Sequence, residues 1–252
     1  MRLTLLGTGN AAGVPLYGCD CAHCMAARCN RELQRTPCSA LLTAGEQRFL
    51  LDAGQVDLCE KFPPGTLDGI FLTHFHPDHV QGLFHLRWGI GKTLPVYTPS
   101  DSEGCLDLYK HSGILDFIPQ RKFESFNLAG MEITPVPLLH SRPTFGYLFK
   151  KAGERIAYLT DTKGLSPGTA SFLAGQSLDL MVIDCSYVPG SEEMGHNNFD
   201  DVVLIDKLVQ PKRIILTHVG HDLDIWLSHN QKRIPSHMTI GKDGMTVFPL
   251  SP

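Results

Sequence analysis

The most constraining feature of the sequence is the segment His74-Phe75-His76-Pro77-Asp78-His79, which places four metal-binding side chains within six residues. It follows Gly69-Ile70-Phe71-Leu72, an apolar run typical of a short buried strand. His74 and His76 are two residues apart, so both point to one side of an extended segment. Pro77 prevents the strand from continuing, so Asp78 and His79 can turn toward a second metal. A surface histidine cluster is the alternative interpretation.

Three further candidate ligands each come directly after an apolar run: His140 after 131–139, Asp161 after 155–160 and His218 after 213–216. The carboxyl ends of strands share one edge of a sheet, so we expect these side chains to meet the 74–79 segment. Imidazole suits divalent zinc, manganese and iron, and carboxylates shift the preference toward Mn²⁺. The pattern therefore predicts a catalytic centre of divalent metals.

The expected elements indicate an α/β fold. The predicted strands are 3–6, 39–43, 48–51, 69–72, 95–97, 131–139, 155–160, 178–183 and 213–216, and the predicted helices are 80–88, 104–110 and 199–209, the last with Asn198 as its N-cap. Strands and helices alternate, but residues 39–51 read as a hairpin, which favours mixed sheets covered by helices. With 252 residues and 42% hydrophobic content, we expect one domain over 1–252.

A second group of possible ligands lies in the segment 10–38, which we expect to be a long loop held by something other than a hydrophobic core. Cys19, Cys21 and Cys24 supply three thiols there, and three thiolates with one nitrogen ligand are typical of structural Zn²⁺. The fourth ligand stays open on local sequence: His23, Cys29 and Cys38 are possible. Three reduced cysteines without a metal are the alternative.

Charge and hydropathy restrict the partners of the protein. The formal net charge is −4, which argues against a general nucleic-acid binder. No apolar run approaches the roughly 20 residues that span a bilayer, so we expect no membrane association. The N-terminal apolar run is too short for a signal peptide, which favours a cytoplasmic protein.

The metal segment, together with Asp52-Ala53-Gly54, resembles the signature of the metallo-β-lactamase superfamily. Leu6-Gly7-Thr8-Gly9, Val14-Pro15 and His140-Ser141 resemble its phosphodiesterase branch, which includes the tRNA 3′-processing endonucleases. Further segments are similar to the phosphoribosyl cyclic phosphate phosphodiesterases (PhnP) of the carbon–phosphorus lyase pathway: the cysteine triad, 79–84, 86–89 and 144–148. This resemblance covers nearly the whole chain.

The resemblance implies an αββα sandwich, in which two mixed β-sheets are flanked by helices. It implies two catalytic metals, the first held by His74, His76 and His140, the second by Asp78, His79 and His218, with Asp161 bridging both. It further implies that Asp52 braces the histidine loop and that His221 is the fourth ligand of the structural zinc. It also suggests a homodimer.

Two acid–base roles complete the predicted site. His196 precedes the helix expected at Phe199, and we predict that it donates the proton to the leaving oxygen, as the resemblance also implies; a solvated loop histidine is the alternative. Asp78 is the second predicted catalytic residue. The start of the helix could bind a phosphate, and Arg87, Arg142 and Lys163 could hold a second one. Asp184 is interpreted as scaffold only.

We therefore expect a phosphodiesterase that uses two divalent metals, Mn²⁺ with Zn²⁺ or Fe²⁺ as alternatives, and one structural Zn²⁺. Two such metals can lower the pKa of a bound water and stabilise the charge on phosphoryl oxygens. The resemblance implies that the reaction hydrolyses 5-phosphoribosyl 1,2-cyclic phosphate to a ribose bisphosphate. The alternatives are a tRNA 3′-processing endonuclease, a lactonase-type hydrolase, and a metal-containing binding protein without turnover.

Overall fold

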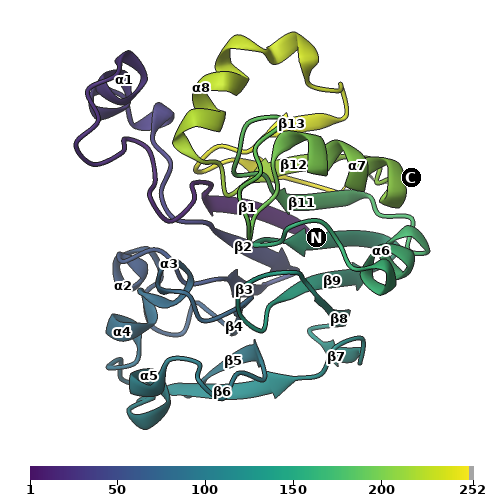
Figure 1. Ribbon diagram of the computed structural model, residues 1–252. Coiled ribbons are helices and arrows are strands. Elements are labelled where there is room, and N and C mark those ends of the chain that lie inside the picture. The colour runs from purple at the N-terminus through teal and green to yellow at the C-terminus, as the bar shows by residue number, and fades with distance from the viewer. Residues whose placement is uncertain (250–252) are drawn as a thin grey trace.

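The computed structural model describes residues 1–249 and contains two seven-stranded sheets packed face to face (Figure 1). The first sheet has the order β14 (Thr246–Val247), β1 (Arg2–Gly7), β2 (Ser39–Ala44), β3 (Gln47–Leu51), β4 (Gly69–Phe71), β5 (Leu94–Pro99) and β6 (Leu115–Gln120). Its strands pair antiparallel from β14 to β3 and parallel from β3 to β6. The sheet is therefore mixed, as predicted.

The second sheet repeats this plan. Its order is β13 (Met238–Ile240), β12 (Ile214–Thr217), β11 (Leu180–Asp184), β10 (Glu154–Leu159), β9 (Phe145–Lys151), β8 (Met131–Pro137) and β7 (Phe126–Leu128). Strands β7 to β10 pair antiparallel and β10 to β13 pair parallel. Parallel strands of one sheet end at the same edge, so the segments that follow β10, β11 and β12 begin side by side.

The core between the sheets follows from the two-residue alternation of strand side chains. In β9, Tyr147 and Phe149 are buried between the sheets with Phe49 and Phe71, whereas Leu148 faces the helices on the other side. Burial of one such side chain stabilises the fold by roughly 1.5–3 kcal/mol. Both faces of the second sheet are thus apolar, which explains the near-continuous apolar runs in the sequence.

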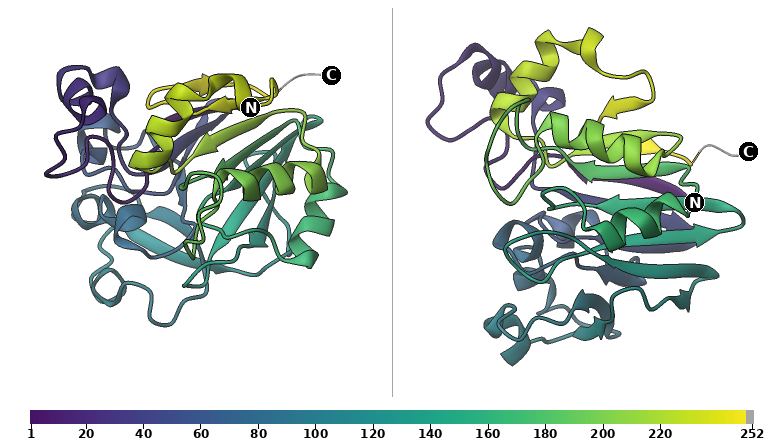
Figure 2. Two further views of the ribbon diagram at one scale, coloured as in Figure 1. Left: turned by 45° about the horizontal axis from the view of Figure 1, so that its top comes forward. Right: turned by 45° about the vertical axis from the view of Figure 1, so that its right-hand side comes forward.

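Helices cover the outer face of each sheet (Figures 1 and 2). The first sheet carries α2 (Leu58–Lys61), α3 (Pro77–Val80), α4 (Leu83–Leu86) and α5 (Leu106–Lys110), and the second carries α6 (Pro167–Ala174), α7 (Phe199–Val209) and α8 (His221–His229). The predicted αββα sandwich is confirmed. Within residues 1–249, no helix has both the length and the apolar character needed to cross a membrane.

Two sequence-based expectations were wrong in detail. The predicted helix 80–88 is split into α3 and α4, because the Gly82 amide donates to the Ala53 carbonyl at 2.8 Å instead of continuing the helical pattern. The segment 10–38 is not only loop: it contains α1 (Ala22–Cys29) and the short 3₁₀ helix η1 (Arg31–Leu33). A second such helix, η2 (Gln231–Arg233), follows α8. The predicted hairpin 39–51 and helix 199–209 are confirmed.

Candidate metal centre

The predicted catalytic ligands come from both sheets and lie at one edge of the sandwich. The chain adopts left-handed backbone angles within two residues of the ends of β3, β10 and β12, with φ of 56° at Asp52, 65° at Asp161 and 57° at His218. Such angles cost on the order of 1–3 kcal/mol in residues other than glycine and are concentrated at functional sites. They end each strand and turn these three side chains into the shared edge.

The first group of side chains consists of His74, His76, His140 and Asp161. The Nδ1 atom of His76 lies 2.8 Å from Nε2 of His74 and 3.0 Å from Nε2 of His140. The Asp161 carboxylate lies 3.5 Å from the same His74 nitrogen and 3.7 Å from that of His140. Three imidazole nitrogens and one carboxylate oxygen thus converge on a single point.

The second group consists of Asp78, His79 and His218, and it also faces Asp161. The Asp161 carboxylate is 3.3 Å from Nε2 of His79 and 3.4 Å from Nε2 of His218. The Asp78 carboxylate is 3.4 and 3.6 Å from these two nitrogens. Asp161 therefore lies between the two groups, where one carboxylate could bridge a pair of metals.

The hydrogen bonds around the imidazoles test whether these groups fit metal ions. The outer nitrogens have partners: Nδ1 of His79 binds Asp52 at 2.9 Å, that of His218 binds the Ser186 hydroxyl at 2.9 Å, and that of His140 binds the Gly195 carbonyl at 2.8 Å. Among the described residues, the buried Nε2 atoms of His79 and His218 have no hydrogen-bond partner. Burying a nitrogen lone pair that accepts no hydrogen bond costs free energy. The group that is hydrogen-bonded to Nδ1 of the same imidazole fixes the tautomer in which Nε2 can bind a metal. The donor set fits divalent metals.

Most pKa values at the site agree with this assignment. His79 is the exception: burial lowers its pKa, but the charges of Asp161 and Asp52 raise it well above its usual value, so this imidazole has to lose a proton when it binds a metal. Burial, with the charges of neighbouring imidazoles, lowers the pKa of His74 and His140 and lowers that of His76 to about 4. Burial raises the pKa of Asp78 and Asp161, but the close contacts and charges of the surrounding histidines outweigh it and lower both pKa values. Neutral imidazoles and ionised carboxylates are the forms that bind metals.

His196 lies beside this centre and is held by a carboxylate. Its Nδ1 is 2.8 Å from Asp184 Oδ2, and its ring stacks on His218 with 4.7 Å between ring centroids. Burial alone lowers the pKa of His196, but the hydrogen bond and charge of Asp184 raise it to about 9. The His196 imidazole can therefore carry a proton at neutral pH.

The interpretation of Asp184 as scaffold only was incomplete, because this residue orients His196 and accepts a 2.8 Å hydrogen bond from the Ser186 hydroxyl. Asp184 is the last residue of β11, so the strand-end rule that found the other candidates applies to it as well. Ser186, in the same segment, was likewise given no role beyond scaffold; its hydroxyl lies 2.9 Å from Nδ1 of His218, a contact that no sequence motif indicates.

The predicted phosphate-binding groups are engaged within the protein. Each of the three cations forms an ion pair: Arg87 with Asp107 at 2.7 Å, Arg142 with Asp101 at 3.0 Å and Lys163 with Asp201 at 2.7 Å. The start of α7 is closed by a capping box, in which Asn198 accepts from the Asp201 amide and the Asp201 carboxylate accepts from the Asn198 amide. A phosphate would meet carboxylates there, so the suggested phosphate site at this helix was wrong.

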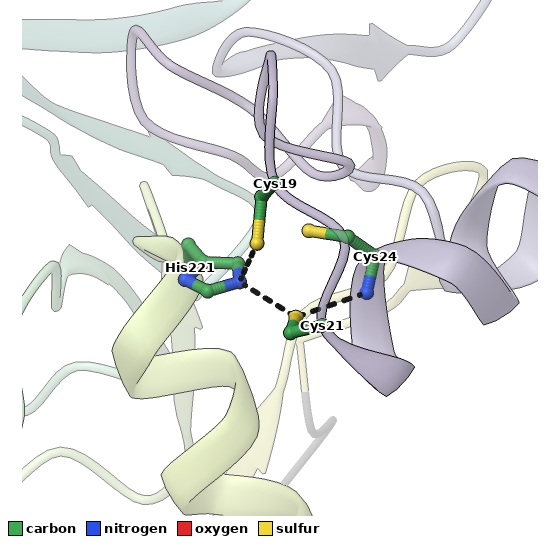
Figure 3. Close-up of side chains that lie close together, drawn as sticks. All are labelled: Cys19, Cys21, Cys24 and His221. Carbon is green, nitrogen blue, oxygen red and sulfur yellow. Dashed lines mark hydrogen bonds between the residues drawn. The ribbon is translucent and has the colours of Figure 1, made fainter.

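The cysteine triad lies next to the start of α8 (Figure 3). Nε2 of His221 is 3.3 Å from Sγ of Cys21 and 3.8 Å from Sγ of Cys19, and Cys24 completes a group whose ligand atoms all lie within 4.8 Å of one another. The Cys24 amide and then His221 lower the pKa of Cys21 to about 6. The geometry brings together the four residues of the predicted zinc site.

The other candidates for the fourth zinc ligand lie elsewhere. His23 pairs with Asp224 at 2.8 Å, and Cys29 is exposed at the end of α1. Cys38 is buried, and its Sγ contacts the Tyr158 hydroxyl at 3.3 Å. Zinc binding itself remains a prediction.

Replacement of Cys21 by serine is expected to remove zinc and lower the melting temperature by about 5–10 °C. The reason is that the segment 10–38 loses the link to His221, and a structural metal contributes directly to folding; each kcal/mol shifts the melting temperature of a chain this long by about 2–4 °C. Calorimetry and zinc analysis measure both effects. Cys29→Ser, an exposed thiol of the same segment, is the control and should change neither. Full stability and zinc content in Cys21→Ser would make the triad ordinary thiols.

Two sheets in an αββα sandwich, with histidine and aspartate groups sharing one carboxylate at the sheet edge, define a protein of the metallo-β-lactamase fold. Residues 47–219 match the model of the β-lactamase superfamily domain, and the chain belongs to this family. The predicted membership is confirmed.

Similar proteins extend the match to the whole chain. A crystal structure described as a new diphosphatase from the PhnP family is 27% identical, with a TM-score of 0.83, over 98% of this chain and 97% of that one. The predicted closeness to the PhnP family is thereby confirmed. An octanoyltransferase of Porphyromonas gingivalis is 28% identical over 97% of this chain, which spans only 51% of that protein. A ribonuclease Z of Thermococcus onnurineus is 30% identical over 55% of this chain and 50% of its own length.

Proposed function

We propose that the protein is a metal-dependent phosphodiesterase that opens a cyclic phosphate on a phosphorylated sugar, with 5-phosphoribosyl 1,2-cyclic phosphate as the substrate to test first. The observation that carries the proposal is the position of Asp161 between two groups of imidazoles, with the His196–Asp184 pair beside them. Such a site can bind two cations and still offer a proton donor that holds no metal.

In this proposal the seven side chains of the centre hold two divalent metals, with Mn²⁺ preferred and Zn²⁺ or Fe²⁺ possible: His74, His76, Asp78, His79, His140, Asp161 and His218. When bound, the metals supply an activated water and stabilise negative charge on phosphoryl oxygens. Cys19, Cys21, Cys24 and His221 hold the structural Zn²⁺. Asp52 keeps His79 in the tautomer whose Nε2 faces the centre.

His196 acts as the general acid. The leaving oxygen of a sugar is strongly basic, so it needs a proton as its bond to phosphorus breaks. The ion pair with Asp184 keeps the His196 imidazole protonated and oriented. Asp78, at the other side of the centre, contributes its carboxylate to the group around His79 and His218.

Diphosphate esters are the second candidate substrates, and two observations favour them. The PhnP-family structure that is similar over nearly the whole chain is described as a diphosphatase. In addition, the three cations proposed for a second phosphate are paired with carboxylates, which gives a sugar 5-phosphate no ready partner among them. A tRNA precursor is a weaker candidate because the net charge is −4. We also propose a cytoplasmic homodimer.

A panel of substrates tests the function. Protein loaded with Mn²⁺ is incubated with the phosphoribosyl cyclic phosphate, a nucleoside diphosphate ester, a tRNA precursor, a lactone and an octanoyl ester, the last chosen because of the octanoyltransferase match. Phosphorus NMR should identify a ribose bisphosphate as the product of the first. Faster turnover of the diphosphate ester would replace the cyclic phosphodiester by a phosphoanhydride as the bond that is cleaved, and would keep only metal-dependent hydrolysis at phosphorus. Turnover of only the lactone or the octanoyl ester would contradict a phosphodiesterase.

A further inference from the structure

The segment His140-Ser141-Arg142 contacts the first histidine pair at three places. His140 contributes Nε2 to the group around His76, at 3.0 Å. The Ser141 hydroxyl lies 3.4 Å from Nε2 of His76, the nitrogen on the other side of that ring. Arg142 donates from Nη1 to the carbonyl of Phe75, the residue between His74 and His76, at 3.3 Å. One short segment thus holds a ligand, the ring of another ligand and the backbone between two ligands.

Arg142 also connects the segments 140–142 and 74–76 to a third segment, the turn at residues 101–104. Its Nε and Nη2 atoms lie 3.2 and 3.0 Å from Asp101 Oδ2, and Nη2 donates to the Gly104 carbonyl at 2.9 Å. Asp101 Oδ1 in turn accepts from the amides of Glu103 and Gly104 at 3.0 and 2.9 Å. The Asp101 side chain is only 5% exposed, so its pairing is protected from water.

The planar guanidinium makes this arrangement rigid. Three of its nitrogens donate in fixed directions to the 101–104 turn and to Phe75, which lysine cannot reproduce with a single ammonium. The Phe75 ring is buried against Tyr109 of α5, with 5.3 Å between ring centroids. The backbone of residues 74–76 is therefore held from two sides, by its carbonyl and by its ring.

From these contacts we infer that Arg142 is a positioning residue that sets the separation of His140 from the His74–His76 pair and so determines the affinity of the metal held by these three histidines. The inference rests on the proposed metal centre. It assigns to Arg142 a role through the protein backbone, in place of the phosphate contact suggested by the sequence. Mutation of residues that contact a metal ligand, without binding the metal themselves, commonly lowers metal affinity by about 10–100-fold.

Metal titration of the apoprotein tests the role of Arg142 without any substrate. Calorimetry with Mn²⁺ compares the wild type, Arg142→Ala, Arg142→Lys and Lys212→Ala. The last variant breaks the pair with Asp179, a carboxylate that is likewise 5% exposed but outside the site. We expect one of the two catalytic metals to bind about 10–100-fold more weakly in both Arg142 variants, and normal affinity in Lys212→Ala.

Arg142→Lys separates positioning from folding, since it keeps a cation beside Asp101 and so should keep the wild-type melting temperature while losing affinity. Unchanged affinity in a folded Arg142→Lys would overturn the inference, as would equal weakening in Lys212→Ala. A wild-type protein that binds none of Mn²⁺, Zn²⁺ and Fe²⁺ at the centre would overturn the proposed function and the inference together, whereas normal wild-type binding with unchanged variants would overturn the inference alone.

Discussion

Asp161→Ala is expected to abolish phosphodiesterase activity while leaving the fold intact. Its carboxylate lies 3.3–3.7 Å from nitrogens of His74, His79, His140 and His218, so its loss removes the one group shared by both halves of the centre. Loss of a single electrostatic group in a preorganised site costs about 10²–10³-fold. The loss of a bridging ligand should exceed this, and kcat at saturating metal measures it.

The metal content of the Asp161→Ala variant is the second measurement that tests the role of Asp161. Wild-type protein purified without chelator should approach three metals per chain, one of them resistant to mild chelation, and Asp161→Ala should lose the two others. Asp206→Ala is the matched control, because Asp206 also binds a histidine, His237, at 2.9 Å but on α7 away from the centre. Near-normal kcat in Asp161→Ala with saturating metal would reject the bridging role.

His196→Ala should impair substrates in proportion to the basicity of their leaving groups. A sugar alkoxide needs a proton in the transition state, so its hydrolysis should slow by about 10²–10⁴-fold. A p-nitrophenolate leaves without a proton, so hydrolysis of bis-p-nitrophenyl phosphate should change far less. Metal content should stay the same, because His196 is proposed to hold a proton and not a metal. Parallel rate measurements on the two substrates, with metal analysis, test the assignment.

The pattern of losses separates the roles of His196. If His196 is a solvated loop histidine, His196→Ala should leave both rates unchanged. If His196 is a metal ligand, the variant should lower both rates and lose metal. Equal losses with metal retained would contradict the general acid and indicate phosphate positioning. Asp184→Asn should show the same dependence on the leaving group, to a smaller extent, because it weakens the 2.8 Å contact that orients the ring. His237→Ala, the surface partner of Asp206, is the control.

Elements with local signals were predicted well. Two short apolar runs flank the turn at residues 44–47, and the sequence before Phe199 supplies an N-cap, so the β2–β3 hairpin and α7 follow from local preference. Elements that depend on distant partners were missed or misjudged. Gly82 reads as part of a helix, yet a Cβ there would lie 2.2 Å from the Gln55 carbonyl oxygen, so the chain packs against another segment at that point.

The sequence by itself determined which side chains are available for the predicted metal sites: their types, their positions after apolar strands, and the thiol triad of residues 19–24. Only the tertiary structure decided how they combine. It brings Asp184 to His196 and Arg142 to Phe75, and it places His221, which only the family resemblance had suggested, beside Cys21. The physical reason is the distance along the chain over which each effect acts. Periodicity and turn preference act over a few residues, whereas these contacts depend on the order of strands in two sheets. That order is determined by burial of the whole core, which no single segment encodes.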